Sequence, residues 1–539
     1  MEKNFIIAIV LSAAILVGYN YLFPPFKAAP QVKAPAAAPV KLTAPAPGQG
    51  PAPAAAAAPS PVVSLLGVSG APIKDITIDT SLYSAVITTE GGTIKSFKLK
   101  KYPDDKGKPL EMVPPGEQIM PLALVPAGAT PAQAENVIYS ADKDSLTLAN
   151  GARGTLTLTT QGQDGKSLTK TLVFRDGSYL IDGSFELGGY PSAVMYMGDG
   201  FGNIGALPLA GKGVKRYGYA GPMALVDGNK YPKTGLFHWL GIKLGLEKPE
   251  GPVKEYAGKK GWAAVMDTYF MAAVVPSGPI KAILGQGTVE TDIAGIQSAG
   301  PSEKFQLYIG PKEYNRLKAA DNELERAIDF GWFAFIAKPL FVALKFFYRM
   351  VGNWGWAIVV LTVVIKLVFA PLTHKSQKSM RRMQKLQPLF AELKEKYKGD
   401  PARLNKEMME LYKKHKVNPM GGCLPMLIQI PVFIALYRVL GNAIELRHAP
   451  FIFWLHDLSA KDPYYVLPIV MGVSMLVMQK MTPTTMDPKQ NMIMMLMPVM
   501  MTFFFINLPS GLVLYFTVSN LLTMAQQFYI NRFSSDNQT

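Results

Sequence analysis

The chain of 539 residues is 49% hydrophobic and only 17% charged, which leaves room for several domains and predicts membrane-spanning segments beside a soluble part. A single cysteine, Cys423, excludes an internal disulfide framework and any zinc or iron–sulfur site built from several cysteines. The formal net charge is +16, and residues 374–418 alone hold 13 Lys and Arg against 5 Asp and Glu. Because Lys and Arg accumulate in cytoplasmic loops, we expect this stretch to face the cytoplasm.

The first 62 residues predict an anchor followed by a spacer. An apolar run over residues 5–23, preceded by Lys3, has the character of a signal peptide but ends in Tyr-Asn-Tyr instead of small residues. We therefore predict an uncleaved transmembrane anchor over residues 1–23, with a cleaved signal peptide as the alternative. Residues 24–62 are rich in Ala and Pro and predict an extended linker.

Residues 63–320 predict a large all-β domain. Stretches such as SLYSAVITTEGGTIKSFKLKKY and SLTKTLVFRDGSYLIDGSFEL alternate apolar and polar residues on either side of Gly-Gly and Asp-Gly turns. Many short strands of this kind are typical of an antiparallel sandwich, which would lie in the periplasm after an anchor whose N-terminus is cytoplasmic. The domain has one histidine, His238, and no evident pair of carboxylates, so we expect no enzyme there.

Residues 321–353 predict an amphipathic helix that lies in the membrane interface. The segment is apolar but includes Asp329, Lys338 and Arg349, with Pro339 near its middle. If it spanned the bilayer, the basic stretch that begins at residue 374 would lie outside the cell, against the positive-inside rule. We therefore expect it to lie along the surface, with a hinge at Pro339.

Residues 354–374, WGWAIVVLTVVIKLVFAPLTH, predict a transmembrane helix with a polar face. Lys366 lies inside the apolar run, where a cation costs roughly 2.5–3.5 kcal/mol and needs water or a partner. At about 100° per residue, Thr362, Lys366 and Thr373 fall on one side of the helix. The alternative is that Lys366 simply extends to the interface at the end of the helix.

Residues 375–418 predict a cytoplasmic hairpin of two helices. Apolar residues recur at three- and four-residue steps, and Gly399-Asp400-Pro401 supplies a helix-ending residue, an N-cap and a first-turn proline in succession. The basic surface favours contact with anionic lipid head groups or ribosomal RNA. A merely solvated surface is the alternative.

Residues 419–530 predict transmembrane helices 3 to 6, before a cytoplasmic tail over 531–539. We expect these helices at residues 421–442, 464–481, 491–508 and 511–530. In the last one, Tyr515, Ser519 and Gln526 have the same spacing as the polar stripe around Lys366, so the two helices are predicted to line one polar cavity. The alternative is that the Ser and Gln side chains bond to carbonyls of their own helix.

Four stretches resemble the YidC/Oxa/Alb family of membrane-protein insertases, in its Gram-negative YidC form. They are NPMGGCLPMLIQIPVFIALYRVL, HDLSAKDPYYVLPIVMGVSM, QKMTPTTMDP and PSGLVLYFTVSNLLTMAQQ. The order of an anchor, a large periplasmic domain and a five-helix core is similar as well. The resemblance implies a polytopic α-helical protein of the bacterial inner membrane with both termini in the cytoplasm, which is not an enzyme and uses no cofactor.

The resemblance also implies a mechanism. The five helices would enclose a hydrophilic groove, open to the cytoplasm and to lipid, through which nascent membrane proteins enter the bilayer alone or beside the Sec translocon. The ribosome and the signal-recognition machinery would contact the basic hairpin. Lys366 corresponds to the cation of the groove, which is usually arginine in Gram-negative members. The positions that contact substrate helices correspond to Thr362, Tyr515 and Phe516, and Gln429 corresponds to a polar position that lines the groove. Ser519 joins this predicted site through the polar stripe of the last helix.

Lysine in place of arginine makes the groove's hydration matter, because lysine can lose its proton when it is desolvated. The main alternative function is a secondary transporter or channel that uses Lys366 as an ion or substrate site. That function predicts inverted repeats and polar residues through the full membrane depth, and the sequence has neither. A periplasmic module with helices that serve only as an anchor would leave the basic hairpin and the polar stripes unexplained. The sequence contains no G-x-x-x-x-G-K-[ST] motif for a nucleotide.

Overall fold

The computed structural model describes residues 72–113, 119–129, 133–134, 137–162, 165–198, 220–232, 253–286, 292–397, 399–415, 424–481 and 488–533. The predicted anchor at residues 1–23, the linker at 24–62, His238 and residues 534–539 lie outside this part. The chain divides into two compact units, one that ends at Ala327 and one that begins at Ile328.

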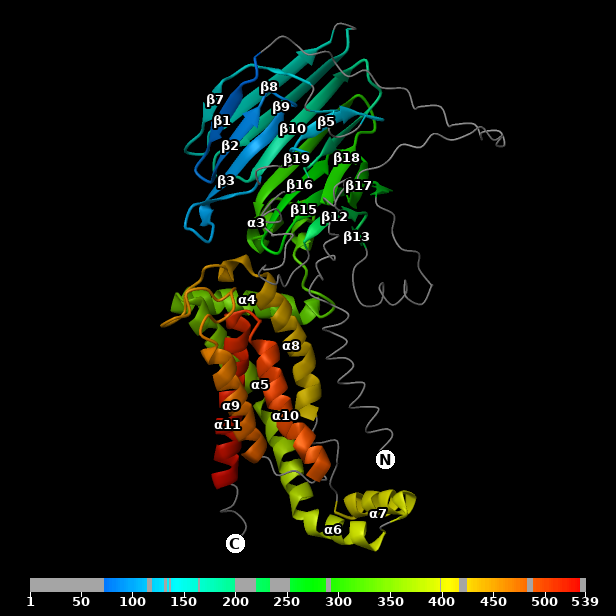
Figure 1. Ribbon diagram of the computed structural model, residues 1–539, viewed down its shortest axis with the longest axis vertical. Helices are drawn as coiled ribbons and strands as arrows, with labels where there is room; N and C mark the ends of the chain where they lie inside the picture. The colour runs from blue at the N-terminus through cyan, green and yellow to red at the C-terminus, as the bar shows by residue number, and fades with distance from the viewer. Residues whose placement is uncertain are drawn as a thin grey trace, which may run out of the picture. The chain divides into compact units, whose positions relative to one another are not determined.

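The first unit consists mainly of β-strands, drawn from blue to green in Figure 1. Their bounds are β1 Asp75–Asp79, β2 Tyr83–Thr88, β3 Thr93–Pro103, β4 Pro109–Glu111, β5 Ala123–Pro126, β6 Ser140–Ala141, β7 Ser145–Thr147, β8 Arg153–Gln161, β9 Ser167–Arg175, β10 Leu180–Gly188, β11 Ala193–Tyr196, β12 Gly221–Val226, β13 Asn229–Tyr231, β14 Val253–Gly258, β15 Gly261–Met266, β16 Phe270–Pro276, β17 Ile280–Gln286, β18 Asp292–Gln297 and β19 Ser302–Pro311. They form a first five-stranded sheet, β4-β3-β2-β1-β7, a nine-stranded sheet, β13-β12-β15-β16-β19-β10-β9-β8-β6, and a second five-stranded sheet, β14-β17-β18-β11-β5.

The predicted alternation is clearest in β9, SLTKTLVFR. Every second side chain of this strand is buried, namely those of Leu168, Lys170, Leu172 and Phe174. The strand pairs antiparallel with β8 and with β10, and Gly177 in the turn to β10 has φ +77°. Glycine adopts this left-handed conformation readily, which explains the Asp-Gly turn seen in the sequence.

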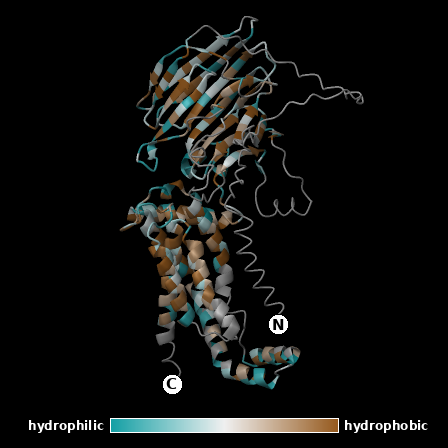
Figure 2. Ribbon diagram, in the orientation of Figure 1, coloured by the Kyte–Doolittle hydropathy of each residue, from teal (hydrophilic) through white to brown (hydrophobic). Residues whose placement is uncertain are grey.

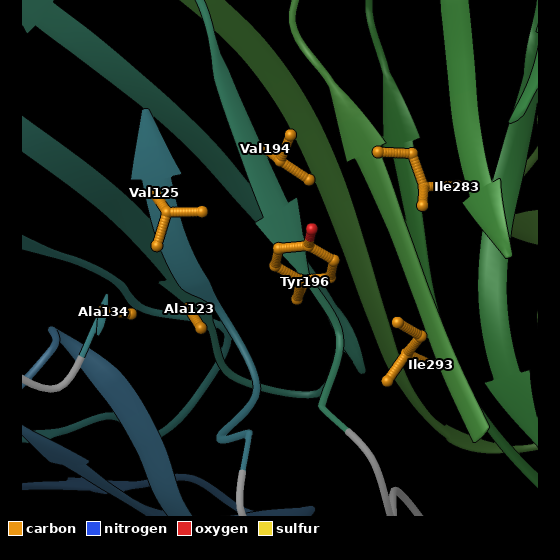
Figure 3. Close-up of a cluster of buried hydrophobic side chains, with 7 residues drawn as sticks. All are labelled: Ala123, Val125, Ala134, Val194, Tyr196, Ile283 and Ile293. Atoms are coloured by element: carbon orange, nitrogen blue, oxygen red, sulfur yellow. The ribbon is translucent and has the colours of Figure 1, made fainter. Parts of the chain in front are cut away.

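One strand pair departs from the predicted antiparallel arrangement, because β1 and β7 pair in parallel. A parallel pair needs a long crossover, and several other strands separate β1 from β7 in the chain. The second five-stranded sheet has an apolar cluster of its own, shown in Figure 3. The side chains in the cluster come from β5, β11, β17 and β18, with Ala134 beside them: Ala123, Val125, Val194, Tyr196, Ile283 and Ile293.

The second unit is helical. After α3 (Tyr314–Ala319) and the 3₁₀ turn η2 (Leu324–Ala327), which belong to the first unit, its helices are α4 Ala334–Val351, α5 Trp354–Lys385, α6 Gln387–Lys396, α7 Pro401–Lys414, α8 Leu424–Asn442, the 3₁₀ turn η4 Ile444–Leu446, α9 Val466–Met481, α10 Pro488–Phe505 and α11 Ser510–Phe533. Figure 1 shows α5, α8, α9, α10 and α11 running alongside one another, with α4 across one end.

Two boundaries in this unit differ from the prediction. Residues 321–353 do not form one helix: α4 begins at Ala334 and continues through Pro339, so the predicted hinge does not break it. Pro339 lies in the second turn and removes one backbone hydrogen bond, yet the helix continues beyond it to Val351. In addition, α5 runs past the predicted end at residue 374 as far as Lys385, because no glycine interrupts it there.

The predicted connection between the two helices of the hairpin is confirmed. Gly399 has φ +120°, the Asp400 carboxylate accepts a hydrogen bond from the Arg403 backbone N–H at 3.0 Å, and Pro401 is the first residue of α7. The ring of Phe390 lies 5.1 Å from that of Tyr412, so α6 and α7 pack against each other. In Figure 2 these two helices mix polar and apolar residues, whereas the bundle is mainly hydrophobic.

Among the described helices, only Trp354–His374 within α5 is long and apolar enough to cross a membrane. Val466–Met481 and Met495–Phe505 are apolar but shorter. Large apolar side chains on α9 and α10 are nevertheless exposed, including Ile469, Val473, Leu496, Met500 and Phe503. The described part of the chain therefore contains one clear span, together with two shorter apolar helices whose surfaces are partly exposed.

Candidate functional site

The predicted site residues lie on α5, α8 and α11. Helix α11 packs against α5 and α9 and also contacts α8, so it can join polar groups from different helices. Tyr515, Ser519 and Thr523 follow one another along α11 at four-residue steps, and each step raises the chain by about 6 Å on the same face. These side chains make the polar contacts to the other two helices.

Three of the predicted residues are brought together at the contact between α8 and α11. The Gln429 side-chain N–H group donates a hydrogen bond to the Tyr515 hydroxyl oxygen at 2.6 Å. The Ser519 side chain also hydrogen-bonds the Tyr515 hydroxyl. Tyr515 is only 1% exposed and Ser519 is 6% exposed, so these contacts satisfy polar groups inside the bundle. Together they tie α8 to α11.

Lys366 makes a separate contact between α5 and α11. Its Nζ donates a hydrogen bond to Thr523 Oγ1 at 2.8 Å, and the Thr523 hydroxyl donates to the backbone carbonyl of Ser519, also at 2.8 Å. Among the described residues, no carboxylate lies within ion-pair distance of Lys366. The cation is therefore held by a neutral oxygen, and its charge is not neutralised by any of these residues.

The two threonines of the predicted stripe on α5 do not join this network. Thr362 is fully buried, and its hydroxyl donates to the carbonyl of Ile358 in its own helix at 2.6 Å. The Thr373 hydroxyl donates to the Phe369 carbonyl at 3.0 Å in the same way. Threonine hydroxyls often bond one turn back in apolar helices, so these two side chains are satisfied within α5 and make no polar contact to another described helix.

Phe516 lies in an aromatic cluster beside the polar contacts. Its ring centroid is 4.9 Å from that of Phe433 on α8 and 4.7 Å from that of Phe505 at the end of α10, both in edge-on arrangements. The adjacent Tyr515 ring lies 5.2 Å away. The site therefore has an apolar side, built from α8, α10 and α11, next to its hydrogen-bonded side.

At the N-terminal end of α11, the loop over residues 443–465 packs tightly against the helices. Asp462 is fully buried, and its carboxylate accepts hydrogen bonds from Trp454 Nε1 and from the Leu467 backbone N–H. Ser510 donates its backbone N–H to the Ala460 carbonyl at 2.7 Å. Because these buried polar groups have partners, the loop covers this end of α11 with ordered structure.

Helix α4 is attached to α8 at the same end of the bundle. The Asp329 carboxylate lies 2.9 Å from Arg438 Nη1, and Lys345 Nζ lies 3.3 Å from the Glu445 carboxylate. Lys345 also lies over the Phe341 ring, 5.3 Å from its centroid. These contacts join the segment before α5 to the C-terminal part of α8, at Arg438, and to the turn η4 that follows it, at Glu445.

The sequence prediction did not include Thr523. The signal was present, because Thr523 follows Ser519 by four residues just as Ser519 follows Tyr515, whereas the predicted stripe continued to Gln526 instead. Which position on α11 meets Lys366 depends on how α5 and α11 cross. The sequence does not specify that geometry.

Comparisons with known proteins agree with the resemblance seen in the sequence. Residues 346–537 match the model of the "60Kd inner membrane protein" family, and residues 75–343 match that of the "YidC periplasmic domain". The proteins named membrane protein insertase YidC in Geotalea daltonii and Geobacter metallireducens are 40% and 42% identical to the chain, over 99% of its length and 99% and 98% of theirs.

A crystal structure described as an active YidC insertase with the first transmembrane domain resolved is 18% identical, with a TM-score of 0.37, and the match covers 85% of this chain and 94% of that one. The full-length relatives account for both units, with residues 75–343 as a periplasmic domain and residues 346–537 as an inner-membrane part. The chain belongs to the YidC family of membrane protein insertases.

Proposed function

We propose that this chain inserts nascent membrane proteins through a polar groove whose cation is Lys366. The observation that supports this most strongly is the contact made by that cation. Lys366 lies in the one clear span, and its ammonium is bonded to a neutral hydroxyl with no carboxylate nearby among the described residues. Charged residues inside membrane spans are costly, and they are usually found where they act on a substrate or ion.

The proposed groove acts by electrostatics and by partitioning. Its polar groups shorten the apolar distance that a substrate's polar tail crosses, and the Lys366 charge attracts tails that contain carboxylates. An apolar substrate helix then leaves sideways into lipid, because burial in hydrocarbon removes its surface from water. The aromatic cluster around Phe516 offers this helix an apolar surface beside the polar one.

The interhelical hydrogen bonds suggest which helices a substrate separates. Gln429 on α8 and Tyr515 on α11 are joined by one hydrogen bond, which is worth about 1 kcal/mol net. A substrate that offers its own polar groups replaces that bond at little cost. We therefore infer that substrate helices enter between α8 and α11, with Ser519 and Thr362 as parts of the surrounding wall.

Five membrane-spanning helices, α5, α8, α9, α10 and α11, form the proposed core, with the N-terminal anchor as a sixth span and both termini in the cytoplasm. The basic hairpin of α6 and α7 would then face the cytoplasm, where anionic lipid head groups attract it. The ribosome and the signal-recognition machinery are proposed partners of this hairpin. The Sec translocon is a proposed partner for substrates that need it.

The experiment replaces Lys366 in full-length protein and measures insertion, by protease protection, of one reporter whose translocated tail has either several acidic residues or none. Lys366→Arg should retain activity because arginine keeps the charge. Lys366→Ala should slow the acidic-tailed reporter selectively. Lys366→Glu should slow that reporter further, because like charges repel.

A lysine that only extends to the interface predicts a different result. In that case Lys366→Ala is tolerated, and the tail charge has no effect. Equal losses in the Ala and Glu variants, independent of tail charge, would reduce Lys366 to a packing residue and refute the electrostatic mechanism.

A further inference from the structure

Thr523 is the only hydrogen-bond partner of Lys366 among the residues that the structure describes, and it lies on a different helix. We propose that Thr523 is the positioning residue for the substrate-attracting cation: it holds the Lys366 ammonium inside the groove and so sets the preference for acidic tails. This inference rests on the proposed function, because it concerns how the same cation is placed.

The Thr523 hydroxyl is fixed in the orientation that accepts from a cation. Its proton is donated to the Ser519 carbonyl at 2.8 Å, so the oxygen presents its lone pairs to Lys366 Nζ. Threonine has restricted freedom about χ1, and in a helix its hydroxyl can bond the carbonyl one turn back, as Thr523 does. A hydroxyl that donates to a carbonyl is also a better acceptor, since hydrogen bonds in a chain polarise one another.

A neutral partner leaves the charge available, which a carboxylate would not. An ammonium has three donors, and Thr523 takes one of them. The other two can bond a carboxylate of the substrate, and such a charge-assisted bond is stronger than a bond to a neutral hydroxyl. Thr523 therefore stabilises the resting position of Lys366 without competing with an acidic tail for its charge.

Without this contact, the flexible side chain of Lys366 would extend out of the groove toward the membrane interface. Lysine stems lie along apolar surface while their ammonium groups reach toward water and head groups. Lys366 is about two turns from His374 at the end of the predicted span, within the range in which a lysine can extend to the interface. Thr523 is the contact that opposes this displacement.

The same hydrogen bonds connect the cation to the contact between α8 and α11. Ser519 bonds Tyr515 through its side chain and Thr523 through its backbone carbonyl. The polar groups of α5, α8 and α11 therefore meet along one face of α11. Thr523 lies at the end of this series, next to Lys366.

The test compares Thr523→Val with Thr523→Ser in full-length protein, with the acidic-tailed and neutral-tailed reporters. Valine has the same shape but no hydroxyl, whereas serine keeps the hydroxyl. A hydrogen bond to a charged group corresponds to roughly a tenfold change in an equilibrium, so Thr523→Val should slow the acidic-tailed reporter by about five- to tenfold. The insertion rate of the neutral-tailed reporter should change by less than about twofold. Thr523→Ser should keep the preference of the wild type for acidic tails.

Thr517→Val is the matched control. Thr517 lies on the same helix, and its hydroxyl also bonds one turn back, to the Val513 carbonyl at 2.8 Å. It lies 3.5 Å from the Leu467 carbonyl on α9 as well, but it makes no hydrogen bond to Lys366. If Thr523→Val slows both reporters equally, or no more than Thr517→Val does, Thr523 is a structural residue and the inference is overturned.

Lys366→Ala, measured in parallel, separates this inference from the proposed function. If Lys366→Ala is selective for acidic tails but Thr523→Val is not, the cation acts without positioning by Thr523. If neither variant is selective, both the positioning role and the electrostatic mechanism are refuted.

Discussion

Lys170 joins the three sheets of the periplasmic domain, and its replacement tests how that domain contributes to function. It occupies an inward position in β9 of the nine-stranded sheet and is 4% exposed. Its Nζ donates to the carbonyls of Gly91 and Gly92, in the turn between β2 and β3, and to that of Leu122, just before β5, at 2.8, 2.9 and 2.9 Å. The ammonium also lies 4.9 Å from the centroid of the Tyr139 ring.

Lys170→Met keeps an unbranched side chain but removes all three donors. Each buried carbonyl left without a partner costs about 1–3 kcal/mol. The variant no longer buries a charged ammonium, and this gain offsets part of the total cost of the three carbonyls. We therefore expect a loss of about 3 kcal/mol in the free energy of unfolding, which lowers the melting temperature of a domain this size by about 6–12 °C.

The assay is thermal unfolding of the purified full-length protein in detergent. Unfolding of the periplasmic domain is detected by its cleavage with a protease. Lys98→Met, at an exposed position in β3, is the control and should stay within about 0.5 kcal/mol of the wild type. A loss no larger for Lys170→Met than for this control would show that the three carbonyl contacts contribute no stability.

The pH dependence gives an independent check. Burial lowers the pKa of Lys170 to about 7, whereas a lysine in the unfolded chain titrates near about 10.4. Between these values the unfolded chain binds more protons than the folded domain, so the stability of the wild type should rise as the pH increases from 7 to 9. This contribution should be absent in Lys170→Met.

The same variant bears on function, because the proposed groove lies entirely in the helical unit. Lys170→Met should therefore insert both reporters as the wild type does at temperatures where the full-length protein accumulates normally. A loss of insertion in proportion to the loss of domain stability would show that the folded periplasmic domain takes part in insertion.

Three further predictions concern two ion pairs of the helical unit and the membrane topology. Glu445→Gln removes the charge beside Lys345, and because these side chains are only 14% and 18% exposed, it should cost about 2 kcal/mol by thermal unfolding in detergent. Asp329→Asn, at an ion pair whose side chains are 42% and 36% exposed, should cost less than about 1 kcal/mol. A larger loss of stability for Asp329→Asn than for Glu445→Gln would contradict the expectation that the more buried ion pair contributes more. With Cys423→Ser as background, an impermeant maleimide should label Ser145→Cys from outside the inner membrane and Lys396→Cys only after lysis. Labelling of both from outside would refute the proposed topology.

The periodic features of the sequence predicted much of the fold. Alternation marked the strands, and apolar runs marked the helices α8 to α11 to within a few residues. The alternation in β9 also contains the position of Lys170, which falls in step with Leu168 and Leu172. Its burial was not predicted, because a lysine is usually exposed and its three partners come from distant parts of the chain.

The site could be predicted only in part, because spacing identifies a face but not a partner. Tyr515, Ser519 and Gln429 were all expected at the groove and are joined by hydrogen bonds. Thr362 had the same periodic signal, yet its hydroxyl bonds its own helix. A threonine can bond either way, and the crossing of two helices decides between them.

The presence of lysine instead of arginine at position 366 is easier to understand once Thr523 is included. A guanidinium has five donors in a rigid plane and is best matched by paired acceptors such as a carboxylate. A single hydroxyl would satisfy only a small part of it. A lysine has a compact charge with donors that rotate, so one fixed oxygen on the neighbouring helix is enough to hold it at 2.8 Å. Lysine at position 366 and a hydroxyl at position 523 therefore suit each other, and the proposed attraction of acidic tails depends on both residues.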